Sequence, residues 1–312
     1  MKLVINIPCY NEEKTLPLVL KELPKKIDGI DKIEVQIVDD GSTDNTIEVA
    51  KKFKVNRIVK HKKNLGLGIA FRDGVNAALA NGADILVNTD ADNQYPSKYI
   101  KDLVKPILDE KADIVIGNRN PWKVKHFSLI KRFFQYFGNM AIRYIADSDV
   151  PDTVSGFRAY SRESMLRLNV LTKFSYVLDT IIQASKKGLV IVSVPITTNA
   201  PTRKSRLFKN IFEHIKKSAS NMIRAYTIYE PFKTFLLGSL LFFIPAIVLI
   251  VRFLILYFQG ISGHVQSLII AAIFFILGGG MFILGIIADL IGINRQLMEE
   301  QLYLKKRKFY EK

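Results

Sequence analysis

The chain has 312 residues, of which 49% are hydrophobic, and its formal net charge at pH 7 is +16. A chain of this length can bury one large core or two smaller ones, and its basicity suggests an anionic partner such as nucleic acid, anionic lipid or a phosphorylated substrate. The single cysteine, Cys9, excludes an intrachain disulfide and argues against a cysteine-based metal site.

Short runs rich in β-branched residues alternate with helical stretches in the first 230 residues. The predicted strands are residues 3–8, 34–40, 57–60, 84–90 and 113–118. Helical spacing relates the apolar residues Leu16, Leu20, Leu23 and Ile27 in one segment, and Ala70, Val75, Ala78 and Leu79 in another. This alternation predicts a largely parallel sheet with helices on both faces, which binds ligands beyond the carboxyl ends of its strands.

Polar motifs follow the first and second predicted strands. After the first strand, the segment PCYNEE offers Tyr10 for contact with a base and Glu12 for a polar contact. After the second strand, the segment IVDDGSTDNT offers Asp39 or Asp40 as an acceptor for a base N–H or a ribose hydroxyl. We expect the next polar residues, Ser42, Thr43 and Asp44, to have mainly structural roles. The hydroxyl of Ser42 or Thr43 is available to cap the following helix.

The fourth predicted strand ends in the motif DADNQYP, residues 90–96. Asp90 and Asp92 on a turn can converge on one hard cation, and the side-chain oxygen of Gln94 adds a ligand. A divalent metal there, Mg²⁺ or Mn²⁺, would neutralise charge on a departing diphosphate. The alternative is an Asx-type turn with solvated acids, but the preceding strand and the companion motifs favour the metal site.

Basic and polar residues later in the chain could line the binding site of an acceptor substrate. The segment VPDTVSGFRAYSRE places several of them in a predicted loop, namely Asp152, Ser155, Gly156 and Arg158. Arg119 ends the fifth predicted strand and could line the same side. The segment TRKSRLFK adds Arg203, Lys204 and Arg206, which suit either a phosphate or a lipid headgroup.

Two segments are amphipathic, residues 126–146 and 206–226, with aromatic and aliphatic residues at helical spacing beside Lys and Arg. Each could pack on the sheet. The long apolar segments that follow, residues 235–258 and 265–287, favour helices that lie on a bilayer surface instead.

The two apolar segments are each long enough to span a bilayer, and the six residues between them, 259–264, predict a hairpin. Lys and Arg flank the outer ends, including KKRK at 305–308, whereas the connection QGISGH contains neither. The positive-inside rule therefore predicts a two-span membrane protein whose soluble domain, residues 1–230, and basic tail, residues 291–312, both face the cytoplasm.

Four motifs resemble those of the family 2 glycosyltransferases in order and spacing: P-x-Y-N-E at 8–12, D-D-G-S-x-D at 39–44, D-A-D-x-Q-x-P at 90–96 and S-G-F-R at 155–158. More narrowly, they are similar to the dolichyl-phosphate mannose synthase and polyprenyl-phosphate glucosyltransferase group. The match covers about residues 1–230. It implies an α/β domain of the GT-A (Rossmann-like) fold, with a mostly parallel sheet and helices on both faces, followed by amphipathic interface helices and a two-helix transmembrane hairpin.

The resemblance also implies roles for individual residues. The nucleoside would contact Pro8, Tyr10, Glu12 and Asp40. The nucleotide-sugar and metal would contact Asp90 and Asp92, and Gln94 would bind the metal. Arg119 and four further basic residues would meet donor or acceptor phosphates; these are Lys131, Arg132, Arg203 and Arg206. Ser155 and Arg158 would also lie on the acceptor side. The predicted catalytic residues are Asp90, Asp92 and Arg119.

The expected reaction moves a hexose, with inversion, from a nucleotide-sugar to dolichyl or polyprenyl phosphate, and GDP-mannose is the favoured donor. A phosphate monoester has a second pKa of about 6, so it is largely ionised at pH 7 and needs no strong general base. The alternatives are the same reaction with UDP-glucose or UDP-N-acetylglucosamine, and a membrane-tethered nucleic-acid-binding protein. We expect no nucleic acid partner, because the aromatic residues lie on apolar faces. Membrane lipid is an expected partner, and the sequence does not distinguish a monomer from a homo-oligomer.

Overall fold

The computed structural model describes residues 1–119, 140, 143, 150–172, 176–200, 220, 224, 226–261 and 263–310. The chain divides into two compact units. The first unit contains Met1–Ser218 together with Glu300–Lys312, and the second contains Ala219–Glu299.

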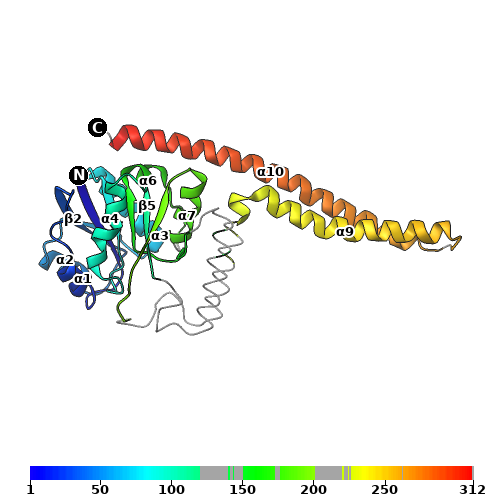
Figure 1. Ribbon diagram of the computed structural model, residues 1–312. Coiled ribbons are helices and arrows are strands. Elements are labelled where there is room, and N and C mark those ends of the chain that lie inside the picture. Colours follow the sequence, from blue (N-terminus) through cyan, green and yellow to red (C-terminus); the bar gives the residue numbers. More distant parts are fainter. Residues whose placement is uncertain are drawn as a thin grey trace. The chain divides into compact units, whose positions relative to one another are not determined.

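In its described residues, the first unit is built on a seven-stranded sheet with the order β3-β2-β1-β4-β6-β5-β7 (Figure 1). The strands are β1 (Lys2–Cys9), β2 (Lys32–Asp39), β3 (Arg57–Lys60), β4 (Ile85–Asn88), β5 (Ile114–Asn118), β6 (Arg158–Ser161) and β7 (Ile191–Pro195). All pairs are parallel except those of β6, which runs antiparallel to β4 and β5. The prediction of a mostly parallel sheet is confirmed, whereas the sequence pattern does not predict β6 and β7.

Helices cover both faces of this sheet. They are α1 (Leu16–Glu22), α2 (Thr46–Lys52), α3 (Leu67–Ala80), α4 (Ile100–Leu108), α6 (Arg162–Arg167) and α7 (Val177–Lys186), with a short 3-10 helix, η1, at Ser97–Tyr99. On one face, side chains of β1 such as Ile5 share a buried apolar cluster with Leu16 of α1 and Leu103 of α4. Helix α3 covers the other face, where Gln36 of β2 donates to the carbonyl of Gly74 at 2.8 Å.

Two helix boundaries differ from the predicted ones. The apolar periodicity extends to Ile27, but α1 ends at Glu22, because Leu23 precedes a proline and adopts an extended conformation with ψ of 138°. The N-cap of α2 is Asn45, and no side chain caps it. Ser42 and Thr43, the predicted caps, bond to the loop after β1 instead.

Buried polar side chains replace part of the apolar core beneath α3. Gln36, Asn6 and Asn88 are buried on the neighbouring strands β2, β1 and β4. Gln36 Nε2 donates to Asn6 Oδ1 at 2.9 Å, and Asn6 Nδ2 donates to Asn88 Oδ1 at 2.8 Å. Helix α3 can approach this chain because residue 74 is glycine, where a Cβ would lie 2.5 Å from Asn6 Oδ1. These hydrogen bonds link β2, β1 and β4 beneath α3, while Gln36 Oε1 has no hydrogen-bond partner among the described residues.

Arg158, at the start of β6, lies in the protein interior and is 0% exposed. Its Nε donates to the carbonyl of Ser155 at 2.7 Å, and its Nη2 donates to that of Thr153 at 3.0 Å. Its Nη1 donates to the Val177 carbonyl at 2.8 Å and to Thr180 Oγ1 at 2.9 Å. The predicted contact of Arg158 with an acceptor phosphate is therefore wrong, because the guanidinium fastens the loop before β6 to the first turn of α7.

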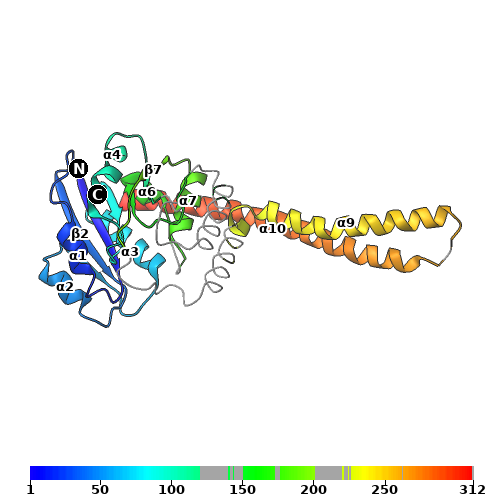
Figure 2. The ribbon, with the colours of Figure 1, turned by 60° about the horizontal axis from the view of Figure 1, so that its bottom comes forward.

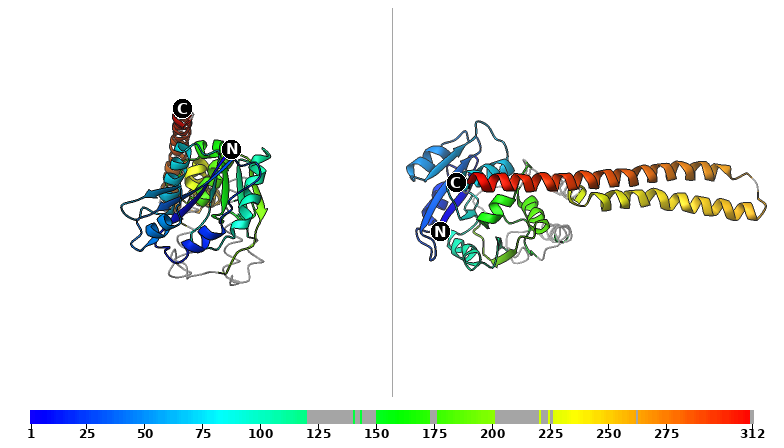
Figure 3. Two further views of the ribbon diagram at one scale, coloured as in Figure 1. Left: turned by 90° about the vertical axis from the view of Figure 1, so that its left-hand side faces the viewer. Right: turned by 90° about the horizontal axis from the view of Figure 1, so that it is seen from above.

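The second unit contains two antiparallel helices, α9 (Pro231–Phe258) and the first part of α10 (Val265–Tyr310), which lie side by side (Figures 2 and 3). Both are long and apolar enough to cross a membrane, with mean hydropathy of 2.7 and 2.6 in their most apolar windows. Phe243 and Phe275 pack edge to face at 5.2 Å between ring centroids. Gly278 allows this packing, because a Cβ there would lie 2.9 Å from the Phe243 ring.

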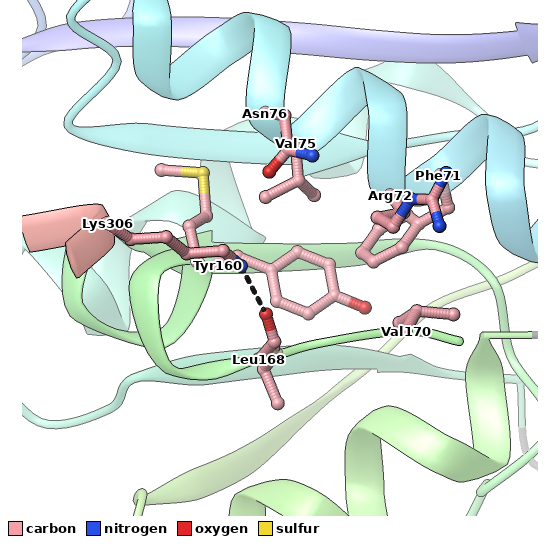
Figure 4. Close-up of a pocket in the computed structure, with 9 residues that line it drawn as sticks. Phe71, Arg72, Val75, Asn76, Tyr160, Leu168, Val170 and Lys306 are labelled. Carbon is pink, nitrogen blue, oxygen red and sulfur yellow. Dashed lines mark hydrogen bonds between the residues drawn. The ribbon is translucent and has the colours of Figure 1, made fainter. Parts of the chain in front are cut away.

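Helix α10 continues well beyond the predicted second span, as far as Tyr310. Its last turns pack on the first unit, where the Tyr303 hydroxyl donates to Glu163 Oε1 at 3.0 Å and the Arg167 guanidinium lies 4.5 Å from the centre of the Tyr303 ring. Lys306 enters a small pocket beside Tyr160, and its Nζ donates to the Leu168 carbonyl at 3.1 Å (Figure 4). In the predicted basic tail, residues 291–312, the described residues 291–310 are helical, and residues 300–310 belong to the first unit by their contacts.

Replacing Arg158 with methionine should strongly destabilise the first unit. Three buried carbonyl groups lose a charged donor, and a hydrogen bond to a charged group contributes about 1.5–3 kcal/mol, so the expected loss is about 3 kcal/mol or more. Thermal unfolding of the purified protein in detergent measures the change. Arg57→Met, at an exposed position of β3, is the matched control, and an unchanged unfolding temperature for Arg158→Met would contradict the assignment.

Candidate active site

The loops that follow β1, β2 and β4 meet at one edge of the sheet, because these strands are parallel neighbours. The first two loops are bonded to each other. The Asn11 backbone N–H donates to Ser42 Oγ at 2.9 Å, and the Thr43 N–H donates to Asn11 Oδ1 at 2.8 Å. The Glu12 N–H donates to Thr46 Oγ1 at 2.8 Å. The prediction that three polar motifs reach one edge is confirmed.

The adjacent carboxylates Asp39 and Asp40 have different surroundings. Asp40 accepts three hydrogen bonds, from His61 Nδ1 at 2.8 Å and from the backbone N–H groups of Leu65 and Gly66 at 2.8 and 2.9 Å. Asp39 is 0% exposed, and its Oδ1 has no hydrogen-bond partner among the described residues. A buried carboxylate oxygen without a donor suits an incoming N–H group. Asp40 thus holds the loop that leads into α3, and Asp39 is the better candidate for the predicted nucleoside contact of Asp40.

The other predicted nucleoside contacts lie in or just after β1. Pro8 is half-buried inside the strand, opposite Val38 of β2. Glu12 is buried, and its Oε2 accepts from Thr15 Oγ1 at 2.6 Å at the start of α1. Tyr10 is 39% exposed. Of these three residues, Tyr10 therefore presents the largest surface to a ligand.

The turn after β4 carries the predicted metal ligands. Asn93 has a left-handed backbone conformation, with φ of 59°, and reverses the chain between Asp92 and Gln94. Gln94 Nε2 donates to Asp92 Oδ2 at 2.9 Å, and the Gln94 N–H donates to Asp92 Oδ1 at 3.1 Å. The Asn199 side chain fixes this turn by donating to the Asn93 carbonyl at 2.9 Å.

These side chains fit a hard divalent cation. A rotation of the Gln94 amide places its oxygen beside the Asp92 carboxylate, and both are oxygen ligands of the kind that Mg²⁺ and Mn²⁺ accept. Asp90 adds a second carboxylate two residues before Asp92. Within the described ranges, no three His, Cys, Asp or Glu side chains converge on one point, so the remaining ligands would come from phosphate oxygens and water.

Arg119, which directly follows β5, is held by Asp152. Its Nε donates to Asp152 Oδ2 at 2.7 Å and its Nη2 to Oδ1 at 2.9 Å, while its backbone N–H donates to Oδ2 at 3.1 Å. Burial alone would raise the pKa of Asp152, but the Arg119 guanidinium outweighs burial and holds this pKa below its usual value. The pair is therefore ionised at neutral pH, and the fork uses two of the five guanidinium N–H donors.

The loop before β6 contacts the turn that carries Asp90. Tyr95 stacks on Phe157, with 5.2 Å between ring centroids, and the Gly156 N–H points to the Tyr95 hydroxyl at 3.4 Å. Ser155 is fully buried, and within the described part of the chain its hydroxyl has no hydrogen-bond partner. The predicted acceptor residue Ser155 therefore lies beside the predicted metal turn.

Several predicted residues lie outside the described residues. These are Lys131, Arg132, Arg203 and Arg206, together with most of the amphipathic segments 126–146 and 206–226.

Sequence reasoning missed the aromatic residues that join the two loops, Tyr95 and Tyr176. Tyr95 stands in the motif DADNQYP and could have been noticed there. Tyr176 has no local signal, because its hydroxyl meets Gly156 and Asn88, which are far away in the sequence.

Two curated proteins illustrate what this chain is similar to. It is 31% identical over 217 residues to the UDP-N-acetylglucosamine–dolichyl-phosphate N-acetylglucosaminyltransferase of Methanococcus voltae, a match that covers 62% of this chain and 83% of that protein. It is 30% identical over 229 residues to the dolichol-phosphate mannosyltransferase of Pyrococcus furiosus, which covers 69% and 62% of the two chains. Relatives named for transfer to dolichyl phosphate thus differ in the sugar.

Among solved structures, the fold is similar to glucosyl-3-phosphoglycerate synthase from Mycobacterium tuberculosis in complex with Mn²⁺ and UDP, with a TM-score of 0.55 and 22% identity over 72% of this chain and 78% of that one. This likeness confirms the GT-A type of fold. The model of the family "Glycosyl transferase family 2" matches residues 4–168, just over half of the chain. The matched residues contain strands β2 to β6 and most of β1, the turn after β4 and the Arg119–Asp152 pair, and the chain belongs to glycosyl transferase family 2.

Proposed function

We propose that this glycosyltransferase moves a hexose from a nucleotide-sugar to a polyprenyl or dolichyl phosphate at a membrane surface, with inversion at the anomeric carbon. The observation that carries the proposal is the arrangement at the carboxyl edge of the sheet. The Asp92–Gln94 pair follows β4, and Arg119, which Asp152 holds, follows β5 of the same sheet. Relatives named for transfer to dolichyl phosphate support the acceptor class.

The proposed reaction requires the protein to position the donor and acceptor and to balance their negative charge, rather than to remove a proton from the acceptor. An acceptor phosphate with a second pKa of about 6 is already a nucleophile at pH 7. Arg119, oriented by Asp152, would bind phosphate oxygens of the donor or acceptor. Asp90, Asp92 and Gln94 would hold Mg²⁺ or Mn²⁺, which when bound would offset negative charge on the diphosphate.

The nucleoside would lie over the loops after β1 and β2. Tyr10 offers an exposed ring for contact with the base, and Asp39 Oδ1 offers a buried acceptor for a base N–H. Both guanine and uracil carry such N–H groups, so this contact suits either nucleotide. We propose GDP-mannose as the first donor to test, with UDP-N-acetylglucosamine and UDP-glucose as alternatives.

The two apolar helices support a membrane protein with a hairpin anchor. Residues 300–310 contact the first unit, so the chain leaves and re-enters the same compact unit on either side of the hairpin. An even number of crossings is consistent with this return. Because the basic residues flank the outer ends of the hairpin, we propose that the first unit faces the cytoplasm.

Purified protein in detergent should transfer sugar from one of the three donors to polyprenyl phosphate in the presence of Mg²⁺ or Mn²⁺. Asp92→Asn and chelation should each lower the rate by about 100-fold or more, because both weaken charge stabilisation at the diphosphate. Formation of acid-labile lipid-linked sugar is the measurement. Asp109→Asn, at the end of α4, is the matched control, and a folded wild-type protein that makes no lipid product from any donor would refute the proposed acceptor.

Substitution of Asp39 should weaken donor binding, whereas substitution of Asp40 should lower stability. Asp39→Asn should raise the KM of the donor about tenfold, since a charged hydrogen bond contributes about 1.5–3 kcal/mol, and it should leave the unfolding temperature unchanged. Asp40→Asn should lower the unfolding temperature, because an amide N–H would face the N–H groups of Leu65 and Gly66. The opposite pattern, with KM changed only in Asp40→Asn, would restore Asp40 as the nucleoside contact.

Cysteine labelling tests the topology. The native Cys9 is buried, so it should contribute little background. Gln259→Cys, between the two helices, should react with a membrane-impermeant maleimide added to intact cells, whereas Lys308→Cys should react only after the cells are opened. Labelling of Lys308→Cys in intact cells would reverse the proposed orientation.

A further inference from the structure

The geometry points to Tyr176, the N-cap residue of α7, as a positioning residue for sugar transfer: its hydroxyl fastens the loop before β6 to the strand end that carries Asp90. This inference rests on the proposed function and assigns a role to a residue that no motif marks.

The Tyr176 hydroxyl has a partner on each side. It donates to the carbonyl of Gly156 at 2.9 Å and accepts from Asn88 Nδ2 at 2.7 Å. Asn88 is the last residue of β4 and lies two positions before Asp90. This hydroxyl therefore connects the loop on the proposed acceptor side with the strand end on the proposed donor side, beside a longer direct bond from Asn88 Nδ2 to the Gly156 carbonyl at 3.4 Å.

Asn88 is itself held in place. Its Oδ1 accepts from Asn6 Nδ2 at 2.8 Å, and Asn6 Oδ1 accepts from Gln36 Nε2 at 2.9 Å. The chain of side chains thus runs from β2 through β1 and β4 to Tyr176 and Gly156. Because every link is buried, each hydrogen bond acts in a low-dielectric setting where a lost partner is costly.

The contact between Gly156 and Asp90 is close. A Cβ added at Gly156 would lie 3.0 Å from the Tyr176 hydroxyl oxygen and 3.4 Å from both carboxylate oxygens of Asp90. The Tyr95 hydroxyl lies 3.4 Å from the Gly156 backbone nitrogen. Gly156 is therefore packed among three groups, and a shift of its loop would change the surroundings of Asp90 directly.

The ring of Tyr176 cannot easily turn away. It stacks on Phe71 of α3 with 4.0 Å between ring centroids and an interplanar angle of 7°. Burial, to which the charge of Asp90 adds, raises the pKa of Tyr176 well above its usual value. The hydroxyl therefore keeps its proton and can donate to Gly156 throughout the pH range of enzyme assays.

Tyr160 provides a matched comparison. It is equally buried, and its ring lies 5.3 Å from Phe71. Its hydroxyl has no hydrogen-bond partner among the residues that the structure describes. If Tyr176 only filled space in the core, loss of either hydroxyl should have the same effect.

The experiment compares Tyr176→Phe with Tyr160→Phe in the purified full-length enzyme, using a donor on which the wild type is active. We expect Tyr176→Phe to lower kcat by about tenfold or more, because small misplacements of reacting groups are costly. Its donor KM should stay near wild type, because Tyr176 does not lie in the proposed nucleoside site. Its unfolding temperature should fall, because the buried Gly156 carbonyl and Asn88 Nδ2 lose this partner. Tyr160→Phe should leave kcat within about twofold of wild type.

Hydrogen exchange followed by mass spectrometry gives a readout independent of turnover. Faster exchange of residues 152–157 in Tyr176→Phe, but not in Tyr160→Phe, is the expected result. A wild-type kcat in Tyr176→Phe, equal losses in both variants, or unchanged exchange in this loop would each overturn the inference. A wild-type enzyme with no lipid product would refute the proposed function, and the exchange experiment would still decide whether Tyr176 holds the loop.

Discussion

The parallel pairing of β1 with both β2 and β4 is the constraint on which the site depends. The register sets Cys9 beside Asp39 and Asn6 beside Asn88, so the loops that follow these strands leave the sheet at one edge. A slip by one residue would turn Asn6 away from Gln36 and Asn88 and break the buried polar chain, because alternate side chains of a strand face opposite sides. The same pairing therefore aligns the core and brings together the loops of the candidate site.

Among the described strands, the antiparallel strand β6 completes the candidate site. Because β6 runs opposite to β4, its first residue, Arg158, lies beside the last residue of β4, Asn88. The residues that precede β6, including Asp152 and Gly156, consequently arrive at the carboxyl edge. A parallel strand at this place would have delivered them to the opposite edge. Asp152 can thus orient Arg119 from β5, and Gly156 can pack against Asp90.

The two units suit different tasks. The first unit contains the Asp92–Gln94 and Arg119–Asp152 pairs, and the second contains two helices apolar enough for a bilayer. The last turns of α10 return to the first unit through Tyr303 and Lys306.

The α/β class, the first five strands, the two apolar helices and the position of the acidic turn after β4 follow from the sequence alone, because periodicity and short motifs are local properties. The tertiary structure alone distinguishes Asp39 from Asp40, since two adjacent carboxylates differ only in the groups that distant segments, such as residues 61–66, bring to them. The tertiary structure alone also shows that Arg158 is buried. An arginine is usually exposed, and its burial requires oxygen atoms from two separate segments, 153–155 and 177–180, that only the folded chain assembles.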